Sequence, residues 1–168
     1  MSRRSASTVA ARLLALAAGL VVTRPLAAQD FAFSPRVQPE LRAELAVARH
    51  ASALALAGVN VPLGYYVRAG LSAGAGVTDV HGHQALALRS DAVVRFLLDP
   101  FAQTAWGPYA GGGLTARRDG ADQPRAGLLL VLGVEGHRGR RWVPAVELAL
   151  GEGARLAVVL RKARKNGR

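Results

Sequence analysis

Residues 64–77, GYYVRAGLSAGAGV, decide how this chain folds. From residue 65 to residue 77 the odd positions form one apolar set, whereas the even positions hold glycine, serine, an arginine and a tyrosine. Alternation with a period of two predicts a β-strand with two different faces. A helix would mix the two sets, and each interior glycine would cost about 1 kcal/mol relative to alanine. We therefore predict a strand over residues 65–77.

The same alternation recurs along the rest of the chain. It predicts five further strands downstream, over residues 85–98, 104–117, 126–137, 142–150 and 154–161. Two stretches upstream, residues 41–49 and 52–61, also alternate. Their alanine, leucine, glutamate and arginine residues favour helices as well, so a helix is the alternative there. With two upstream strands the count becomes eight.

The segments between these strands are short. We predict tight turns at residues 62–64, 99–101, 138–140 and 151–153, and longer polar loops at 78–84 and 118–125. Parallel strands need a crossover of a dozen or more residues, and none of these segments provides one. The sequence therefore predicts an all-β fold, an antiparallel up-and-down β-barrel of about eight strands over residues 40–162.

The chain opens with the features of a secretory signal peptide. Two arginines near the start precede the apolar run LLALAAGLVV at residues 13–22, and two alanines follow at 27–28. The run is too short to span a bilayer as a helix, and the alternative is a buried amphipathic helix. We predict a signal peptide over residues 1–29 and hence export. An N-terminal segment then covers residues 30–39, and a basic tail covers 163–168.

Composition limits the function. The chain has no cysteine, which excludes disulfides, thiolate metal sites and a lipidated cysteine. The net charge is +11, but residues 1–29 hold four arginines and no acid, which leaves 18 basic and 11 acidic groups, or +7. Five of the remaining basic groups lie in residues 161–168. The barrel itself is near neutral, so we expect no nucleic-acid-binding face. No motif indicates a cofactor, and we expect none.

Two kinds of antiparallel barrel share this pattern. A soluble barrel or sandwich buries its apolar face, whereas a transmembrane barrel turns that face to lipid and encloses polar and small residues. The two make opposite predictions for Leu128, Leu130 and Leu132 on one side, and for Arg89 and Glu147 on the other.

Three features favour the transmembrane barrel. The polar face is rich in small residues, and its charges can pair within a narrow interior. We expect the longer loops at the rim opposite the aromatic residues, as in outer-membrane barrels. The predicted interior charges are Glu44, Arg68, Arg89, Asp91, Arg95, Glu135, Glu147 and Arg155. Aromatic residues beside three turns of one rim form the predicted interfacial belt: Tyr65, Tyr66, Phe96, Phe101, Trp106 and Trp142.

On this pattern the chain resembles the small eight-stranded outer-membrane β-barrel proteins of Gram-negative bacteria over roughly residues 40–162. The resemblance implies contact with membrane lipid and assembly by the outer-membrane insertion machinery. Two departures stand out. The last strand ends in Leu160-Arg161-Lys162 rather than in an aromatic residue, and Pro108 and Pro144 lie within strands, where each removes a hydrogen-bond donor.

Catalytic and metal motifs are weak. Residues 70–74 fit Gly-x-Ser-x-Gly, but that motif needs a strand, a turn and a helix, and the alternation continues through Ser72. His81 and His83 provide two of the roughly four ligands of a structural zinc site. We therefore expect an outer-membrane barrel with a structural or interaction role and no catalysis. The alternatives are a soluble periplasmic barrel or sandwich that binds an apolar ligand, and a barrel acyl hydrolase that acts on lipid.

Overall fold

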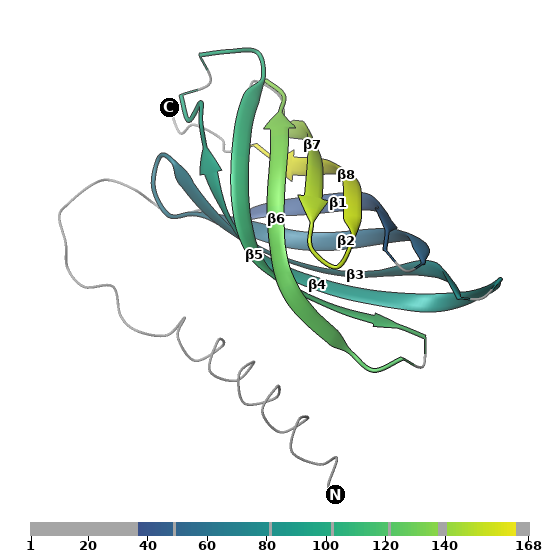
Figure 1. Cartoon of the computed structure of the whole chain (residues 1–168). Helices are drawn as coiled ribbons and strands as arrows, with labels where there is room; N and C mark the ends of the chain where they lie inside the picture. The colour runs from purple at the N-terminus through teal and green to yellow at the C-terminus, as the bar shows by residue number, and fades with distance from the viewer. Residues whose placement is uncertain are drawn as a thin grey trace, which may run out of the picture. The chain divides into compact units, whose positions relative to one another are not determined.

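The computed structural model describes residues 37–48, 50–80, 82–101, 103–120, 122–137 and 141–163. These residues form a closed barrel of eight antiparallel strands, each paired with its neighbours in the sequence (Figure 1). The strands are β1 (Gln38–Val47), β2 (Ala51–Pro62), β3 (Val67–Val80), β4 (His83–Leu97), β5 (Gly107–Asp119), β6 (Arg125–Glu135), β7 (Trp142–Leu150) and β8 (Ala154–Lys162). The predicted fold class is confirmed, and the helical alternative for residues 41–61 is wrong.

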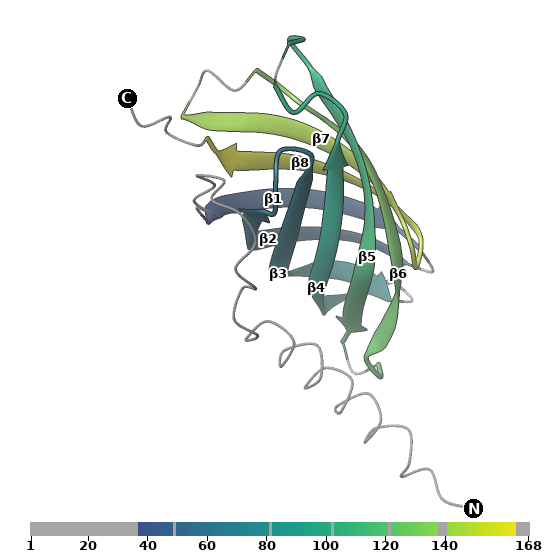
Figure 2. The ribbon, with the colours of Figure 1, turned by 90° about the vertical axis from the view of Figure 1, so that its left-hand side faces the viewer.

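The barrel closes where the first and last strands meet. β1 pairs antiparallel with β8, and the pairing runs from Glu40 opposite Arg161 to Val47 opposite Ala154. Figure 2 shows the sheet curling from β1 round to β8. Closure removes the free strand edges that an open sheet would expose.

The opening stretch behaves as its alternation predicts. In β3, Leu71, Ala73 and Ala75 are exposed on the outside of the barrel. Gly74 and Gly76 face inward, where a Cβ atom would run into the backbone of Ala55 and Ala53 on β2. Glycine is required because the sheet curls so tightly here that the two backbones approach each other closely.

The two rims of the barrel differ from the prediction. We call the rim that holds the connections 63–66, 98–106 and 136–141 the terminal rim, because β1 begins there and β8 ends there. We call the rim that holds the connections 48–50, 81–82, 120–124 and 151–153 the hairpin rim. The longer connections lie at the terminal rim, beside the aromatic residues. The prediction that longer loops lie at the opposite rim is therefore wrong.

Side chains explain both changes in loop length. At the hairpin rim, the Asp79 carboxylate accepts a hydrogen bond from the Gly82 amide at 2.8 Å, and Gly82 has a φ of 80°. This tight turn lets β3 and β4 run through the residues predicted as a loop. At the terminal rim, Asp99 accepts hydrogen bonds from the amides of Gln103 and Thr104 at 3.0 and 2.8 Å, which orders the connection 98–106 before β5 begins.

The prolines lie near the ends of their strands. Pro108 is the second residue of β5 and Pro144 the third residue of β7, both at the terminal rim, and both side chains are exposed on the outside. At such positions a missing N–H disturbs the sheet least.

Other predicted segments fall wholly or partly beyond the described residues. The signal peptide at 1–29 lies outside them, as do most of the segment 30–39 and nearly all of the tail 163–168. The described strands span residues 38–162, against a predicted barrel of 40–162. In the part of the chain that the structure describes, no helix is long and apolar enough to cross a bilayer.

Candidate functional site

The interior of the barrel is the candidate site, because most of the charge of the sheet is buried there. Twelve buried ionisable side chains, seven arginines and five acids, come from every strand except β2. They are Glu40, Arg42, Glu44, Arg68, Arg89, Asp91, Arg95, Arg117, Glu135, Glu147, Arg155 and Arg161. Burial of so many charges is tolerable only if they pair with one another.

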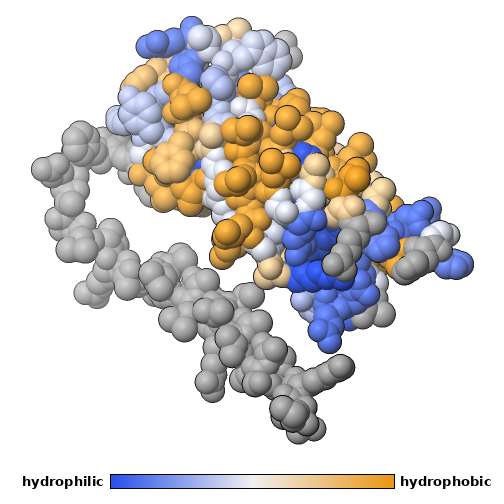
Figure 3. All heavy atoms as spheres, viewed as in Figure 1, coloured by the Kyte–Doolittle hydropathy of each residue, from blue (hydrophilic) through white to orange (hydrophobic). Residues whose placement is uncertain are grey.

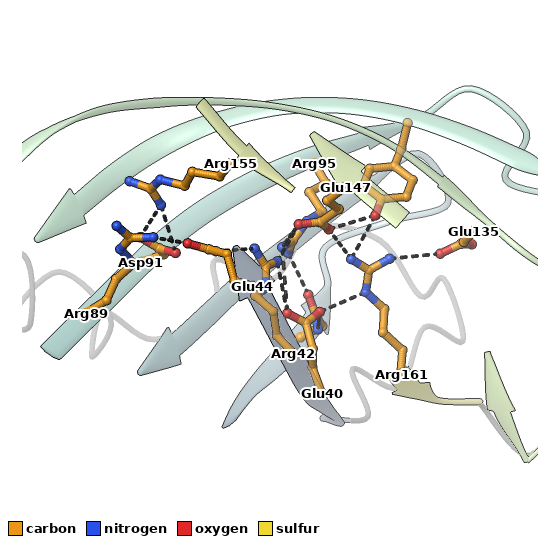
Figure 4. A network of polar contacts seen from close by, with 12 residues as sticks. Glu40, Arg42, Glu44, Arg89, Asp91, Arg95, Glu135, Glu147, Arg155 and Arg161 are labelled. Atoms are coloured by element: carbon orange, nitrogen blue, oxygen red, sulfur yellow. Dashed lines mark hydrogen bonds and ion pairs between the residues drawn. The ribbon is translucent and has the colours of Figure 1, made fainter. Parts of the chain in front are cut away.

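Glu147 is the centre of the network on the side of the terminal rim (Figure 4). Its carboxylate accepts a hydrogen bond from the Tyr109 hydroxyl at 2.7 Å and lies 3.0 Å from Nε of Arg95. Arg42 and Arg161 also form ion pairs with it. One carboxylate on β7 therefore joins guanidinium groups from β1, β4 and β8.

Two further carboxylates extend this cluster. Glu40 accepts hydrogen bonds from Asn60 at 2.7 Å and from Nε of Arg161 at 2.8 Å. Glu135 accepts from Arg68 at 3.0 Å and from Arg161 at 3.3 Å. Arg161, near the end of the last strand, thus bridges Glu40 on the first strand and Glu135 on the sixth. The network joins the strands on both sides of the closing seam.

A second group lies nearer the hairpin rim. Glu44 forms an ion pair with Arg89, and Arg155 lies 3.3 Å from the Asp91 carboxylate. The other Nη of Arg155 donates to the Thr115 hydroxyl at 3.0 Å. These contacts join β1, β4, β5 and β8.

Arg117 is the outermost member of this group. Its Nε donates to Asp119 at 2.7 Å, and its Nη2 lies 3.4 Å from the Thr78 hydroxyl on β3. The two groups are connected through β1, where a nitrogen of Arg42 lies 3.8 Å from Glu44. Linked ion pairs therefore run from Arg161 to Arg89, and the Asp91–Arg155 and Arg117–Asp119 pairs are separate from them.

Glycines provide the space for these long side chains. Gly111 lies directly opposite Arg95 in the β4–β5 register, and Gly70 lies opposite Asn60 in the β2–β3 register. A Cβ atom at Gly70 would lie 2.6 Å from Nη1 of Arg95 and 2.7 Å from Oδ1 of Asn60. The inward glycines of β3 and β5 thus leave the space that the arginine side chains occupy.

Besides the charges, the interior holds the small residues that the prediction expects and also large apolar side chains, which the prediction did not include. Large buried residues of β4, β6 and β8 pack in one cluster with Tyr109 on β5 and with alanines of β7 and β8. A smaller cluster holds Leu54, Leu56 and Ala87. An eight-stranded barrel is just wide enough for side chains to fill. These apolar side chains therefore take up the interior space that the ion network leaves.

All eight predicted interior charges are buried inside the barrel. The prediction missed Glu40, Arg42, Arg117 and Arg161, and with them the excess of arginine over acid. The signal was present, since Arg42 shares the parity of Glu44 and Arg161 shares that of Arg155. Arg161 is the last residue of the predicted strand 154–161, two residues before the predicted basic tail, and Arg117 lies beside a predicted polar loop.

The predicted aromatic residues are all exposed and lie at the terminal rim or at strand ends beside it: Tyr65, Tyr66, Phe96, Phe101, Trp106 and Trp142. Three of them are in contact. The Phe101 ring lies 5.9 Å from that of Tyr65 and 6.2 Å from that of Tyr66, the latter edge to face. Tyr66 is anchored because its carbonyl accepts a hydrogen bond from the Leu97 amide at 2.7 Å.

The outer surface has the polarity predicted for a membrane barrel. Leu128, Leu130 and Leu132 are 77%, 64% and 62% exposed, whereas Arg89 and Glu147 are 3% and 0% exposed. Figure 3 shows apolar residues as a band across the middle of the barrel, with hydrophilic residues towards its ends. A soluble barrel would reverse this arrangement.

The catalytic and metal motifs gain no support from the geometry. β3 continues through Ser72 without a turn or a following helix, so the nucleophile elbow is missing. His81 lies outside the described residues. Among the residues that the structure does describe, no group of three or more histidine and acidic side chains is placed to hold a metal ion.

Comparison with known proteins agrees with the geometry at the level of the fold. The barrel is similar to the crystal structure of Neisserial surface protein A (NspA), with a TM-score of 0.58 and 14% sequence identity, over 76% of this chain and 96% of that one. It is also similar to the N-terminal β-barrel domain of OprF from Pseudomonas aeruginosa, with a TM-score of 0.50 and 17% identity, over 74% and 96% of the two chains. The chain has their fold. No protein-family model and no curated protein sequence matches it.

Proposed function

We propose that the protein is an exported outer-membrane β-barrel with a structural or interaction role and no catalytic activity. The observation that carries this proposal is the inverted polarity of the sheet, with large apolar side chains exposed on the strands and twelve ionisable groups buried within. Exposed apolar area on this scale is costly in water and favourable in lipid.

The similar structures support this location. NspA and the OprF barrel domain are eight-stranded outer-membrane β-barrels. A lipid-embedded barrel also satisfies its backbone hydrogen bonds internally, as a closed sheet does. The partners that follow from the proposal are membrane lipid and the outer-membrane insertion machinery.

The filled interior supports a role other than transport. Tyr109, Leu129 and Val131 occupy the same interior as the ion network, and all three are buried. A barrel of this size has no room for an open solute path through such a core. Its outer surface and its rims are therefore the parts available for interactions.

Labelling of adjacent positions on β6 tests the membrane placement. Because the chain has no cysteine, Leu130→Cys and Val131→Cys each introduce one unique thiol, one outward and one inward. We expect a lipid-soluble maleimide to label the first and spare the second in outer-membrane fractions that retain the protein after carbonate washing. Release of the protein by the wash, or equal labelling of the two thiols, would contradict the proposal.

Lipid A composition with and without the protein tests the absence of acyl hydrolase activity, and we expect no difference.

A further inference from the structure

An open cavity of about 250 Å³ lies at the hairpin rim, across the mouth of the barrel. Side chains from three connections and the adjoining strand ends line it, including His50 near β2, Arg117 and Arg125 on β5 and β6, and Glu152 in the β7–β8 turn. Strands on opposite sides of the barrel thus contribute to one polar site.

Two arginines form one wall of this cavity. Arg117 and Arg125 are directly opposite each other in the β5–β6 register, and Arg89 is opposite Arg117 on the other side. Like charges in this arrangement destabilise a sheet. Each guanidinium of the wall is held by one carboxylate beside it, with Arg117 2.7 Å from Asp119 and Arg125 3.3 Å from Asp122. Both arginines keep further N–H donors beyond these contacts.

Glu152 provides a negative charge from another connection. It is half-buried, and a Cβ atom at Gly127 would lie 3.4 Å from its Cγ, so its side chain lies over β6. Within the described part of the chain, its carboxylate has no hydrogen-bond or ion-pair partner among the contacts of the structure. A carboxylate that lines a cavity and has no ion-pair partner attracts a cation.

We propose that this cavity binds a small zwitterion, with its anionic group at Arg117 and Arg125 and its ammonium group at Glu152. A simple anion fits less well, because the carboxylates of Asp119, Asp122 and Glu152 also line the cavity. The volume lies below the range of drug-sized pockets and matches a molecule with few heavy atoms. The inference goes beyond the proposed function, since it concerns the rim and not the membrane-facing wall.

O-phosphoethanolamine is a probe with both charges. We expect saturable binding to the full chain in octyl glucoside micelles, measured by titration calorimetry. Inorganic phosphate alone and ethanolamine alone should bind at least about tenfold more weakly, because each makes only one of the two charge-assisted contacts. Detergent-solubilised protein is used, so this result does not depend on where the barrel resides.

Two variants test which residue binds each charged group of the probe. Arg125→Gln and Glu152→Gln should each weaken O-phosphoethanolamine binding about tenfold, since each removes one charged partner. Arg118→Gln, on the outer face beside Arg117, is the matched control and should leave binding unchanged. The electrophoretic mobility of the unheated variants checks that each is folded.

Three results would overturn the inference: no saturable binding of the probe, binding unchanged in both variants, or inorganic phosphate binding as tightly as the probe.

A last comparison identifies the natural source of the zwitterionic group. Tighter binding of a short-chain phosphatidylethanolamine than of the free probe supports a lipid headgroup as the ligand. Equal binding supports a free zwitterion.

Discussion

Glu147 is fully buried and forms ion pairs with three arginines, Arg42, Arg95 and Arg161. Glu147→Gln keeps the size of the side chain and removes its charge. We expect the free energy of unfolding to fall by about 3–5 kcal/mol, because buried guanidinium groups lose their counter-charge. Urea titration of the refolded protein in lipid vesicles measures this change.

An exposed ion pair serves as the control for this substitution. Asp122 lies 3.3 Å from Arg125, and both side chains are about half exposed. Asp122→Asn should lower the free energy of unfolding by no more than about 1 kcal/mol. Equal effects of the two substitutions would mean that the interior charges are as well solvated as those at the rim.

Adjacent glycines on β5 give a second residue-scale prediction. Gly113 faces inward, where a Cβ atom would lie 2.8 Å from Cα of Val93, whereas the nearest atom to a Cβ at Gly112 would be 3.4 Å away. Gly113→Ala should therefore reduce the folded fraction, and Gly112→Ala should be neutral or stabilising by about 0.5–1 kcal/mol. The shift between folded and unfolded bands on unheated gels measures both. The reverse order would contradict the assigned faces of β5.

At the scale of elements, the β3–β4 hairpin depends on one backbone conformation. Gly82 has a φ of 80°, which L-residues adopt at a cost of about 1–2 kcal/mol. Gly82→Ala should lower the free energy of unfolding by about that amount. Gly64→Ala is the control, since Gly64 has no strained φ and open space around its Cβ position. No difference between the two variants in urea titrations would show that the hairpin tolerates another turn.

At the scale of the whole molecule, closure of the barrel depends on the β1–β8 seam. Ala43 is opposite Val158 across it, and both face outward. Directly opposite residues in an antiparallel pair lie within the Cα distance that a disulfide spans. Ala43→Cys combined with Val158→Cys should form an intramolecular disulfide on oxidation, detected on non-reducing gels.

The matched control places the second cysteine one strand further away. Val146 is opposite Val158 in the β7–β8 register. Ala43→Cys combined with Val146→Cys should therefore leave two free thiols in the monomer. A crosslink in the control pair and none at the seam would contradict the observed strand order.

Much of this barrel follows from the parity of residues along each strand. An extended backbone points successive side chains to opposite faces, so the sequence alone separates Leu130 from Val131 and Arg95 from Val94. Parity also places Arg42 with Glu44 and Arg161 with Arg155. The residues around Arg42 also favour a helix, and Arg161 lies close to the predicted basic tail, so neither was among the predicted interior charges. The positions of the turns also indicated that the aromatic residues gather at one rim of the barrel.

The sequence by itself determined the strands and the face of each side chain, because both depend on local backbone geometry. Only the tertiary structure decided which charges meet. Arg161 lies beside Glu40 because the sheet closes, although 121 residues separate them. Rim connections also depended on contacts that period two does not encode, such as the Asp79 carboxylate at the Gly82 amide. Strand register and barrel closure decide which interior side chains meet, and both are properties of the whole sheet.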